Sequence, residues 1–311
     1  MKTAFSLTLC LLVLAAASGC ERVDSDTNPD IRFRESGPVQ NPELDEISGL
    51  QASLRNPGVL WVHNDDGPAR VFALGADGSD LGYFDIHDAV NVDWEDIALV
   101  PGARRDLLVL ADVGDNHAAR ERTWLYLVEE PKPDEDGRFS GTREAFHWIS
   151  LSYPDGPRDT ESISWDPVGQ RLLVLSKRDL PPRLYAIDAN TLLTEKEAEL
   201  EFLGEIDRFR APTAADKREF GKRTPWVSQP TGMDISADGR RAAVLTYRSL
   251  YLFERGPDMD WLQGLGTEPV EIIGPPGAHD EVVGFGSDSG QLWIGTEGEH
   301  PPVWEFRIGA E

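Results

Sequence analysis

Five short segments of this 311-residue chain repeat one pattern, with an acidic or amide residue first, a small residue fourth and a large apolar residue fifth. The five segments begin at Glu46, Glu95, Glu161, Gln229 and Glu281. Their starts are 49, 66, 68 and 52 residues apart, and repetition at such a period indicates a solenoid, a propeller or an array. The five first residues are therefore expected to occupy equivalent places in the fold.

Short apolar runs separated by turns rich in Gly, Asp and Asn follow each repeat. In the first unit these runs cover residues 47–52, 59–63, 70–74 and 81–86. Four short strands with no helix-length apolar period between them predict one antiparallel blade per unit. The fold class predicted is therefore an all-β, five-bladed β-propeller.

The fifth unit has one strand fewer than the others, and the stretch 30–35 before the first repeat has no partner in its own unit. Pairing the N-terminal strand 31–35 with the strand 303–308 would close the ring and remove an exposed edge. A six-bladed ring is the alternative, because the second and third periods are long. The excess in the third period, residues 207–228, is charged and predicts an insertion.

The N-terminus has the features of an export signal. Lys2 precedes an apolar run over residues 4–17, which ends in small residues before Cys20. Such a segment is typical of a secretory signal and is short for a membrane span. The junction resembles the bacterial lipobox, with Ala17 where that motif more often has Leu. This resemblance implies a signal peptide over 1–19, a lipidated Cys20, a polar tether over 20–29 and a propeller domain over 30–311.

Lipid attachment would place the protein in the bacterial cell envelope, on the periplasmic side of either membrane or at the cell surface. No other segment is apolar enough to span a membrane, so the anchor would be the lipid alone, and we expect a monomer. The alternative is an ordinary signal peptide with an incidental Cys20. The other cysteine, Cys10, lies in the leader, so the propeller has no disulfide.

The composition excludes one class of partner. The formal net charge is −25, from 55 acidic and 30 basic residues. A nucleic-acid partner is not expected, because its binding requires a basic surface facing the phosphates. The acidic balance favours cations, although most of the surface charge can be explained by solubility alone.

Propeller topology brings the repeat starts together. The five starts lie nearest the central axis, so their side chains should form a ring at one mouth of the channel. Several carboxylates in a narrow channel repel one another unless they are protonated or neutralised by a cation. Oxygen ligands suit Ca²⁺ best, with Mg²⁺ or Mn²⁺ as alternatives. The predicted metal ligands are Glu46, Ser48, Glu95, Glu161, Gln229 and Glu281; salt bridges or capping of backbone N–H groups are the structural alternative.

Loops after each second strand should lie at the same mouth. Two of them are acidic and rich in Asn and Gly, and two are basic. An anionic ligand rich in oxygen could bridge a metal and these basic side chains. The candidate catalytic residues are Asp66 or Asp115 to position water, and Lys177, Arg178 or Arg248 to stabilise charge.

The order of these motifs resembles the calcium-dependent nucleotidases of the soluble apyrase type. The matching positions are Ser48, Asp65, Asp66, Glu95, Glu161, Ser162, Trp165, Lys177, Arg178 and Glu281. The resemblance implies a five-bladed propeller with one Ca²⁺ in its channel that hydrolyses nucleoside diphosphates and triphosphates. Two departures weaken the nucleotidase activity more than the calcium site: Gly49 replaces a second acid, and Thr231 stands near a later Ser of that family.

The chain is also similar to uncharacterised exported bacterial propeller lipoproteins, and less closely to phytase and gluconolactonase propellers. Three functions stay open at this point. The first is a metal-dependent hydrolase of a phosphorylated or other anionic small molecule. The second is a non-catalytic envelope protein with a structural ion, which binds another envelope component, and the third is a lactonase-type enzyme acting on sugar acids.

Replacing Cys20 by Ala tests the predicted lipid anchor and membrane location. The variant should lose lipid labelling and move from the membrane to the soluble fraction, because one thiol carries the only predicted anchor. Metabolic labelling with a fatty acid followed by fractionation measures both effects. Continued membrane association of the variant would contradict the prediction.

Overall fold

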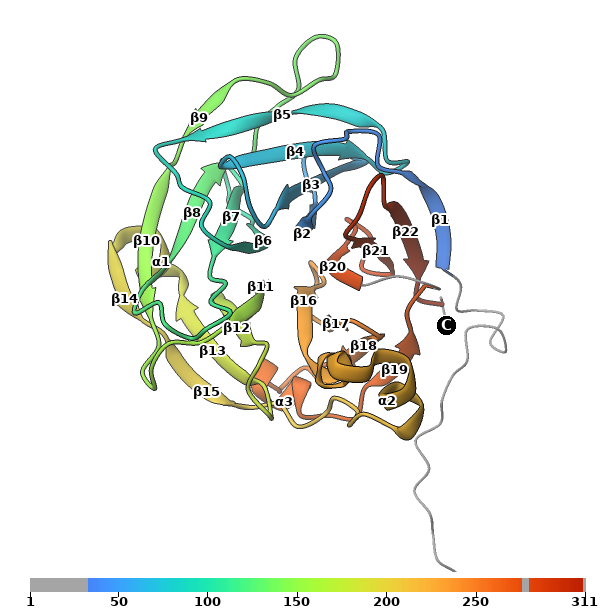
Figure 1. Cartoon of the computed structure of the whole chain (residues 1–311). Coiled ribbons are helices and arrows are strands. Elements are labelled where there is room, and N and C mark those ends of the chain that lie inside the picture. Colours follow the sequence, from blue (N-terminus) through green and yellow to red (C-terminus); the bar gives the residue numbers. More distant parts are fainter. Residues whose placement is uncertain (1–32, 276–279, 310–311) are drawn as a thin grey trace, which may run out of the picture.

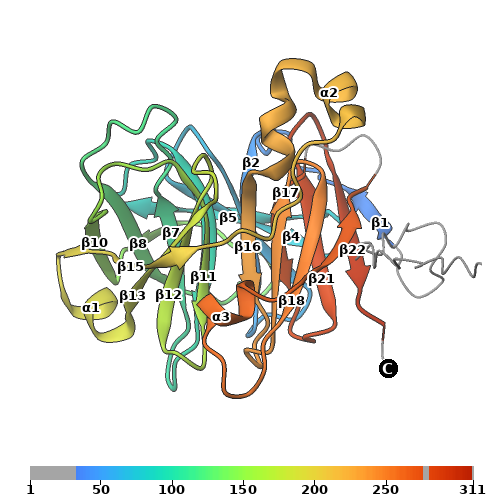
Figure 2. The same cartoon turned by 90° about the horizontal axis from the view of Figure 1, so that it is seen from below.

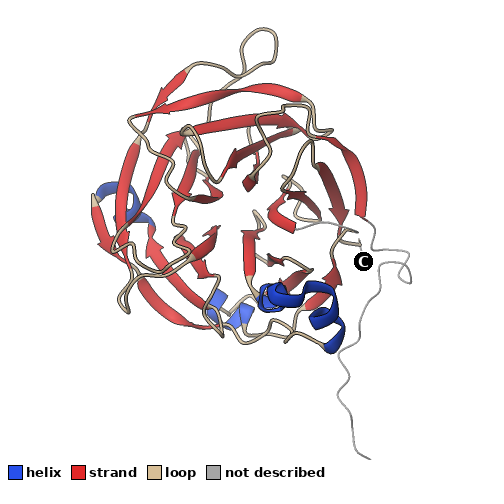
Figure 3. Cartoon of the chain, viewed as in Figure 1, coloured by secondary structure: helices blue, strands red, loops and turns tan. Residues whose placement is uncertain are grey.

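The computed structural model describes residues 33–275 and 280–309 and shows a ring of five β-sheets around a central channel (Figures 1 and 3). The five-bladed propeller is confirmed, and the six-bladed alternative is wrong. Four of the blades follow one another along the chain. The fifth combines both ends of the domain.

The strands of each blade run outward from the channel in chain order. The first blade contains β2 (Ile47–Ala52), β3 (Val59–Asn64), β4 (Arg70–Gly75) and β5 (Asp80–His87); the second contains β6 (Trp94–Val100), β7 (Leu107–Asp112), β8 (Thr123–Glu129) and β10 (His147–Ser152). The third contains β11 (Thr160–Asp166), β12 (Arg171–Ser176), β13 (Arg183–Asp188) and β15 (Glu201–Glu205); the fourth contains β16 (Pro230–Ile235), β17 (Arg241–Thr246), β18 (Ser249–Glu254) and β19 (Val270–Ile273).

The N-terminal strand closes the ring as predicted. In the fifth blade, β20 (Asp280–Phe285), β21 (Gln291–Thr296) and β22 (Pro302–Arg307) are followed by β1 (Phe33–Pro38), which is antiparallel to β22. Phe33 stands opposite Phe306, and their rings are 5.2 Å apart. The predicted start of this strand at Ile31, the tether and Cys20 lie outside the described residues.

Two outer edges are covered by strands from the following unit. Strand β9 (Thr142–Glu144) precedes β10 and pairs in parallel with β5 of the first blade. In the same way β14 (Glu197–Glu199) pairs in parallel with β10 of the second blade. Covering an outer strand satisfies backbone groups that would otherwise be open to another chain.

Three of the blade connections contain helices. Helix α1 (Ala189–Thr194) follows β13, α3 (Trp261–Leu265) follows β18, and α2 (Ala214–Phe220) leads into the 3₁₀ helix η1 (Gly221–Ser228). The last two form the insertion predicted at 207–228, and α2 projects from one face of the ring (Figure 2). No helix among the described residues is long and apolar enough to cross a membrane.

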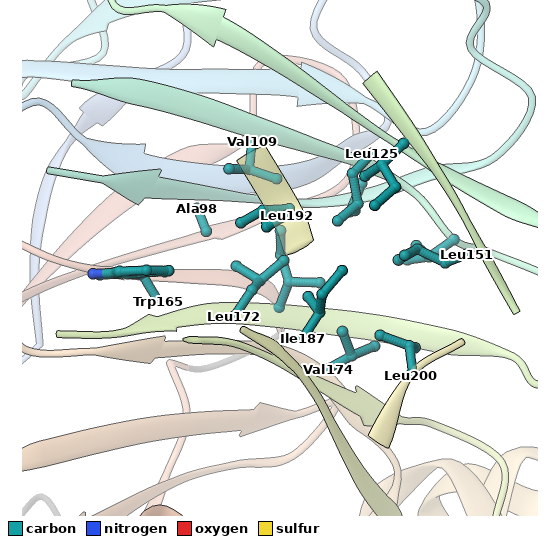
Figure 4. Close-up of a cluster of buried hydrophobic side chains, with 14 of the residues drawn as sticks. Ala98, Val109, Leu125, Leu151, Trp165, Leu172, Val174, Ile187, Leu192 and Leu200 are labelled. Atoms are coloured by element: carbon teal, nitrogen blue, oxygen red, sulfur yellow. The ribbon is translucent and has the colours of Figure 1, made fainter. Parts of the chain in front are cut away.

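Apolar clusters between neighbouring blades form the core. The side chains of β7 alternate between two of these clusters. Leu108 and Leu110 pack toward the first blade, whereas Val109 packs toward the third. Figure 4 shows the cluster between the second and third blades, which includes Trp165 and Leu172. Because β7 is covered on both faces, its residues are apolar from Leu107 to Ala111, as in parallel buried strands.

Deleting β1 tests the closure. A variant lacking residues 21–38 should melt lower and aggregate, because β22 loses its partner and becomes an exposed edge. Deletion of residues 21–32 alone is the matched control, since it removes nothing from β1. Thermal melting followed by size-exclusion chromatography measures both; equal melting temperatures for the two deletions would contradict closure through β1.

Candidate functional site

Every inner strand has a β-bulge near its start. The register shifts between residues 47 and 49 in β2, 94 and 96 in β6, 160 and 162 in β11, 230 and 232 in β16, and 280 and 282 in β20. A bulge redirects one side chain out of the regular alternation of the strand. The bulged residues are Ser48, Glu95, Glu161, Thr231 and Glu281, and all five are buried.

The register shows that the sequence repeat was aligned two residues too early in the first and fourth blades. Ser48 and Thr231, rather than Glu46 and Gln229, stand at the position of Glu95. Glu46 lies two residues before its bulge and is exposed, while Gln229 is buried with its Oε1 atom unpaired. The repeat aligned these residues by type, whereas the bulge is what sets equivalence in space.

Three buried carboxylates meet at the second and third blades. Glu95, Asp159 and Glu161 each place one oxygen within 4.8 Å of the others, and each is at least nine-tenths buried. Ser48 Oγ donates to Glu95 Oε2 at 3.0 Å, which ties the first blade to this group. We call Glu95, Asp159 and Glu161 the carboxylate cluster.

The cluster is under electrostatic strain. Burial raises the pKa of Glu95 well above its usual range, and the charge of Glu161 adds to the effect. Burial raises the pKa of Glu161 to about 7 against the opposing attraction of Lys177. Burial also raises the pKa of Asp93, whose carboxyl group hydrogen-bonds to that of Glu95. Two carboxyl groups can share such a bond only while they hold a proton, so a cation would replace that proton.

Two of the predicted catalytic cations are partners of the cluster. Lys177 is buried, pairs with Glu161 and donates to Tyr247 Oη at 2.9 Å. Burial lowers the pKa of Lys177, but the attractions of Glu161, Tyr247, Glu281 and Glu95 together raise it overall. Arg178 pairs with Asp159 and also donates to Asn116. Both cations therefore hold carboxylates of the cluster in place.

The side chains of the other predicted catalytic residues lie outside the carboxylate cluster. Asp115 supports the cluster through its backbone, since its N–H donates to Asp159 Oδ1 at 3.0 Å, while its own carboxylate accepts from Arg120 N at 2.6 Å. Arg248 pairs with Asp216 of α2 at 3.1 Å.

Asp66 belongs to a second, more exposed acidic group with Glu46 and Asp65. Burial raises the pKa of Asp65 to about 7, and the charge of Glu46 adds to the effect. Glu281, the acid of the fifth repeat, faces the cluster through Lys177: burial raises its pKa well above the usual range and Lys177 opposes the rise. The structure thus brings together Ser48, Glu95 and Glu161, with Glu281 beyond Lys177, and separates Glu46 from them.

The predicted site residues did not include Asp159, Asp93 and Tyr247. A signal for the two acids is present, because each stands two residues before a bulged glutamate, as Asp-x-Glu in the second and third units. On a regular strand, residues two apart place their side chains on the same face. The bulge breaks this alternation, so the sequence pattern alone does not show that each aspartate lies beside the glutamate two residues after it. Tyr247 follows β17 and carries no pattern of its own.

The donor set fits a divalent cation. Carboxylate oxygens and a hydroxyl are hard ligands of the kind that Ca²⁺ takes. Gly114 leaves room for them: a Cβ atom at this position would lie 2.3 Å from Glu95 Oε1 and 2.6 Å from Asp93 Oδ2. The backbone thus approaches the carboxylates at a place where any larger residue would displace them.

Comparisons with known proteins assign neither a family nor a function. No family model and no curated protein matches the chain. A gluconolactonase from Xanthomonas campestris is similar in structure, with a TM-score of 0.46, 14% identity and 90% of each chain covered. A luciferin-regenerating enzyme gives a TM-score of 0.46 at 9% identity, covering 89% of this chain and 95% of its own. Neither is a nucleotidase of the apyrase type, and matches this distant assign no activity.

Replacing Gly114 by Ala should destabilise the protein by about 1 to 3 kcal/mol, because the added methyl group overlaps the carboxylates of Glu95 and Asp93. Urea unfolding measures this. Gly256→Ala is the matched control, since its Cβ atom would meet nothing closer than 3.5 Å. Equal stabilities of the two variants would show that the carboxylates are free to move aside.

Proposed function

We propose that this protein is an exported lipoprotein whose propeller binds a divalent cation, Ca²⁺ by preference, and hydrolyses an anionic small molecule at the same mouth. Glu95, Asp159 and Glu161 are the proposed ligands, with Ser48 Oγ beside them. The lipid anchor and the envelope location belong to the proposal through Cys20.

One observation supports the proposal of a bound cation. Lys177 neutralises Glu161 and Arg178 neutralises Asp159, but Glu95 has no cationic side chain within ion-pair distance among the described residues. Its hydrogen-bond partners are Ser48 and the carboxyl group of Asp93. A buried carboxylate without a cation is costly, and a divalent ion would neutralise it while joining three blades.

Each residue of the site would then have a separate role. A bound cation supplies Lewis-acid activation of a water or of an oxygen of the anion. Ser48 orients Glu95, while Lys177 orients Glu161. Arg178 and the backbone N–H of Asp115 fix both oxygens of Asp159. Asp93, which hydrogen-bonds to Glu95 and whose pKa is raised by burial, is the proposed acceptor of a proton from water.

A second candidate function has its own support. Lys177 already joins Glu161 to Tyr247, so part of the ring is a salt bridge without any ion. This favours a non-catalytic propeller in which the cation is structural and the mouth binds an envelope component. The lactonase alternative uses the same site and differs only in its substrate.

Calcium titration tests the cation site. Calcium at a hundredfold excess over its dissociation constant should stabilise the protein by roughly 2.7 kcal/mol, and chelator should lower the melting temperature. Glu95→Gln and Glu161→Gln should remove most of this response. Glu46→Gln is the control, because it removes an acid that lies outside the cluster. Calorimetry without bound calcium, together with a melting curve that ignores chelator, would contradict the proposal.

Substrate assays on the same variants separate catalysis from structure. Nucleotides, sugar phosphates and lactones should be tested with calcium present. Asp93→Asn should keep calcium binding and lose about 10² to 10⁴-fold in turnover, because it removes the proton acceptor. Calcium binding with no turnover of any of these compounds would favour the non-catalytic function.

A further inference from the structure

The opposite mouth of the channel holds a second ring, which the proposed function does not use. Four residues after each bulge, at or next to their last residue, the inner strands carry Ala52, Leu99, Trp165, Ile235 and Phe285. Each blade thus contributes one residue at the same position. Three of these residues, Leu99, Trp165 and Phe285, are also the apolar fifth residues of their sequence repeats.

A cavity of about 170 Å³ lies at this mouth. Its walls include Leu99, Trp165, Ile235 and Phe285, with Gln51 and Asp234 deeper in the channel; we call it the lower pocket. Its size is that of one ring-shaped molecule, because an apolar cavity of about 150 Å³ lined by similar side chains is known to bind benzene. A well-packed channel would have filled this space with side chains.

The walls contain one buried polar atom in need of a partner. Trp165 is 6% exposed, and its Nε1 atom has no hydrogen-bond partner in the described part of the chain. Figure 4 shows that this nitrogen lies at the end of the ring away from Leu172 and Val174 of the neighbouring cluster. A buried N–H without an acceptor costs about 1 to 3 kcal/mol, so an acceptor brought by a ligand would recover that cost.

The deeper polar groups are already satisfied. Asp234 accepts from the backbone N–H groups of Phe285 at 2.7 Å and Ile235 at 2.8 Å, and from Ser164 Oγ at 3.1 Å. Its carboxylate is therefore committed to joining three blades. Its charge would repel an anion, and the apolar walls would desolvate an ion of either sign. These conditions select an uncharged ligand.

We propose that the lower pocket binds a small uncharged ring molecule that carries one hydrogen-bond acceptor, with Trp165 Nε1 as the donor. This site is separate from the carboxylate cluster, which lies at the starts of the same strands. Binding here requires no cation.

Three probes of nearly equal size test the proposal by titration in NMR. Acetophenone has an acceptor and no charge, ethylbenzene lacks the acceptor, and benzoate is charged. The protein in chelator should bind acetophenone more tightly than ethylbenzene and should not bind benzoate. No binding of either neutral probe at millimolar concentration would overturn the proposal.

Two variants locate the probes. Trp165→Phe should weaken acetophenone about 5- to 10-fold, as expected for one lost neutral hydrogen bond, and leave ethylbenzene unchanged. Ala237→Phe should abolish the binding of both, because Ala237 lies at the exposed rim of the pocket and a ring there would occupy it. Ala119→Phe, at an equally exposed alanine in the loop after β7, is the control.

The variants also have outcomes that contradict the proposal. Unchanged acetophenone affinity in Trp165→Phe would overturn the role of the indole N–H. Unchanged binding in Ala237→Phe would place the probes elsewhere on the protein. Loss of calcium binding in Glu95→Gln should leave all probe affinities as they are, so failure at one mouth is distinguishable from failure at the other.

Discussion

The packing between blades is the constraint on which the rest of this structure depends. Five apolar clusters, one at each interface between neighbouring blades, hold the five inner strands around one axis. Once β1 closes the ring, no inner strand can move outward without opening two of these clusters. Side chains at equivalent positions are therefore forced together whatever their charge, and the buried acids of the channel follow from this geometry.

Buried carboxylates also join the blades to one another. Asp96 accepts from the backbone N–H groups of Ile163 in the third blade at 2.7 Å and of Ile97 at 2.8 Å. Asp234 makes the corresponding bond to Phe285 in the fifth blade. These acids differ from the carboxylate cluster because their oxygens are already satisfied by backbone donors. Among the described residues Glu95 has no such backbone donor, which is why we propose a cation beside it.

The sequence was sufficient to predict the architecture but only part of the site. The repeat, the turns and the incomplete fifth unit predicted five blades and closure by the N-terminal strand, since these depend on patterns of period two and on counting strands. The repeat placed Glu46 and Gln229 in the ring because it aligned residues by type. In the first and fourth blades the bulge lies two residues after the polar residue that the repeat aligned, and no local residue type marks it. The equivalence of Ser48 and Thr231 to Glu95 therefore follows only from the register. Lys177 was predicted at the correct mouth, and its ion pair with Glu161 follows from the pairing of β11 with β12, in which Thr160 stands opposite Ser176.

The five-residue repeat acquires a meaning that its composition did not suggest. Counted from the bulge, its first residue is polar in every blade, as Ser48, Glu95 and Glu161 show, whereas the fifth is apolar in every blade, as Leu99, Trp165 and Phe285 show. A strand rises about 3.3 Å per residue, so four residues separate the two rings by roughly 13 Å along the axis. One short motif therefore builds a channel whose two mouths differ in chemistry: one gathers carboxylates and suits a cation, and the other gathers apolar side chains and suits an uncharged ring. Because each blade contributes to both rings, a change in the frame of one inner strand would alter both mouths together.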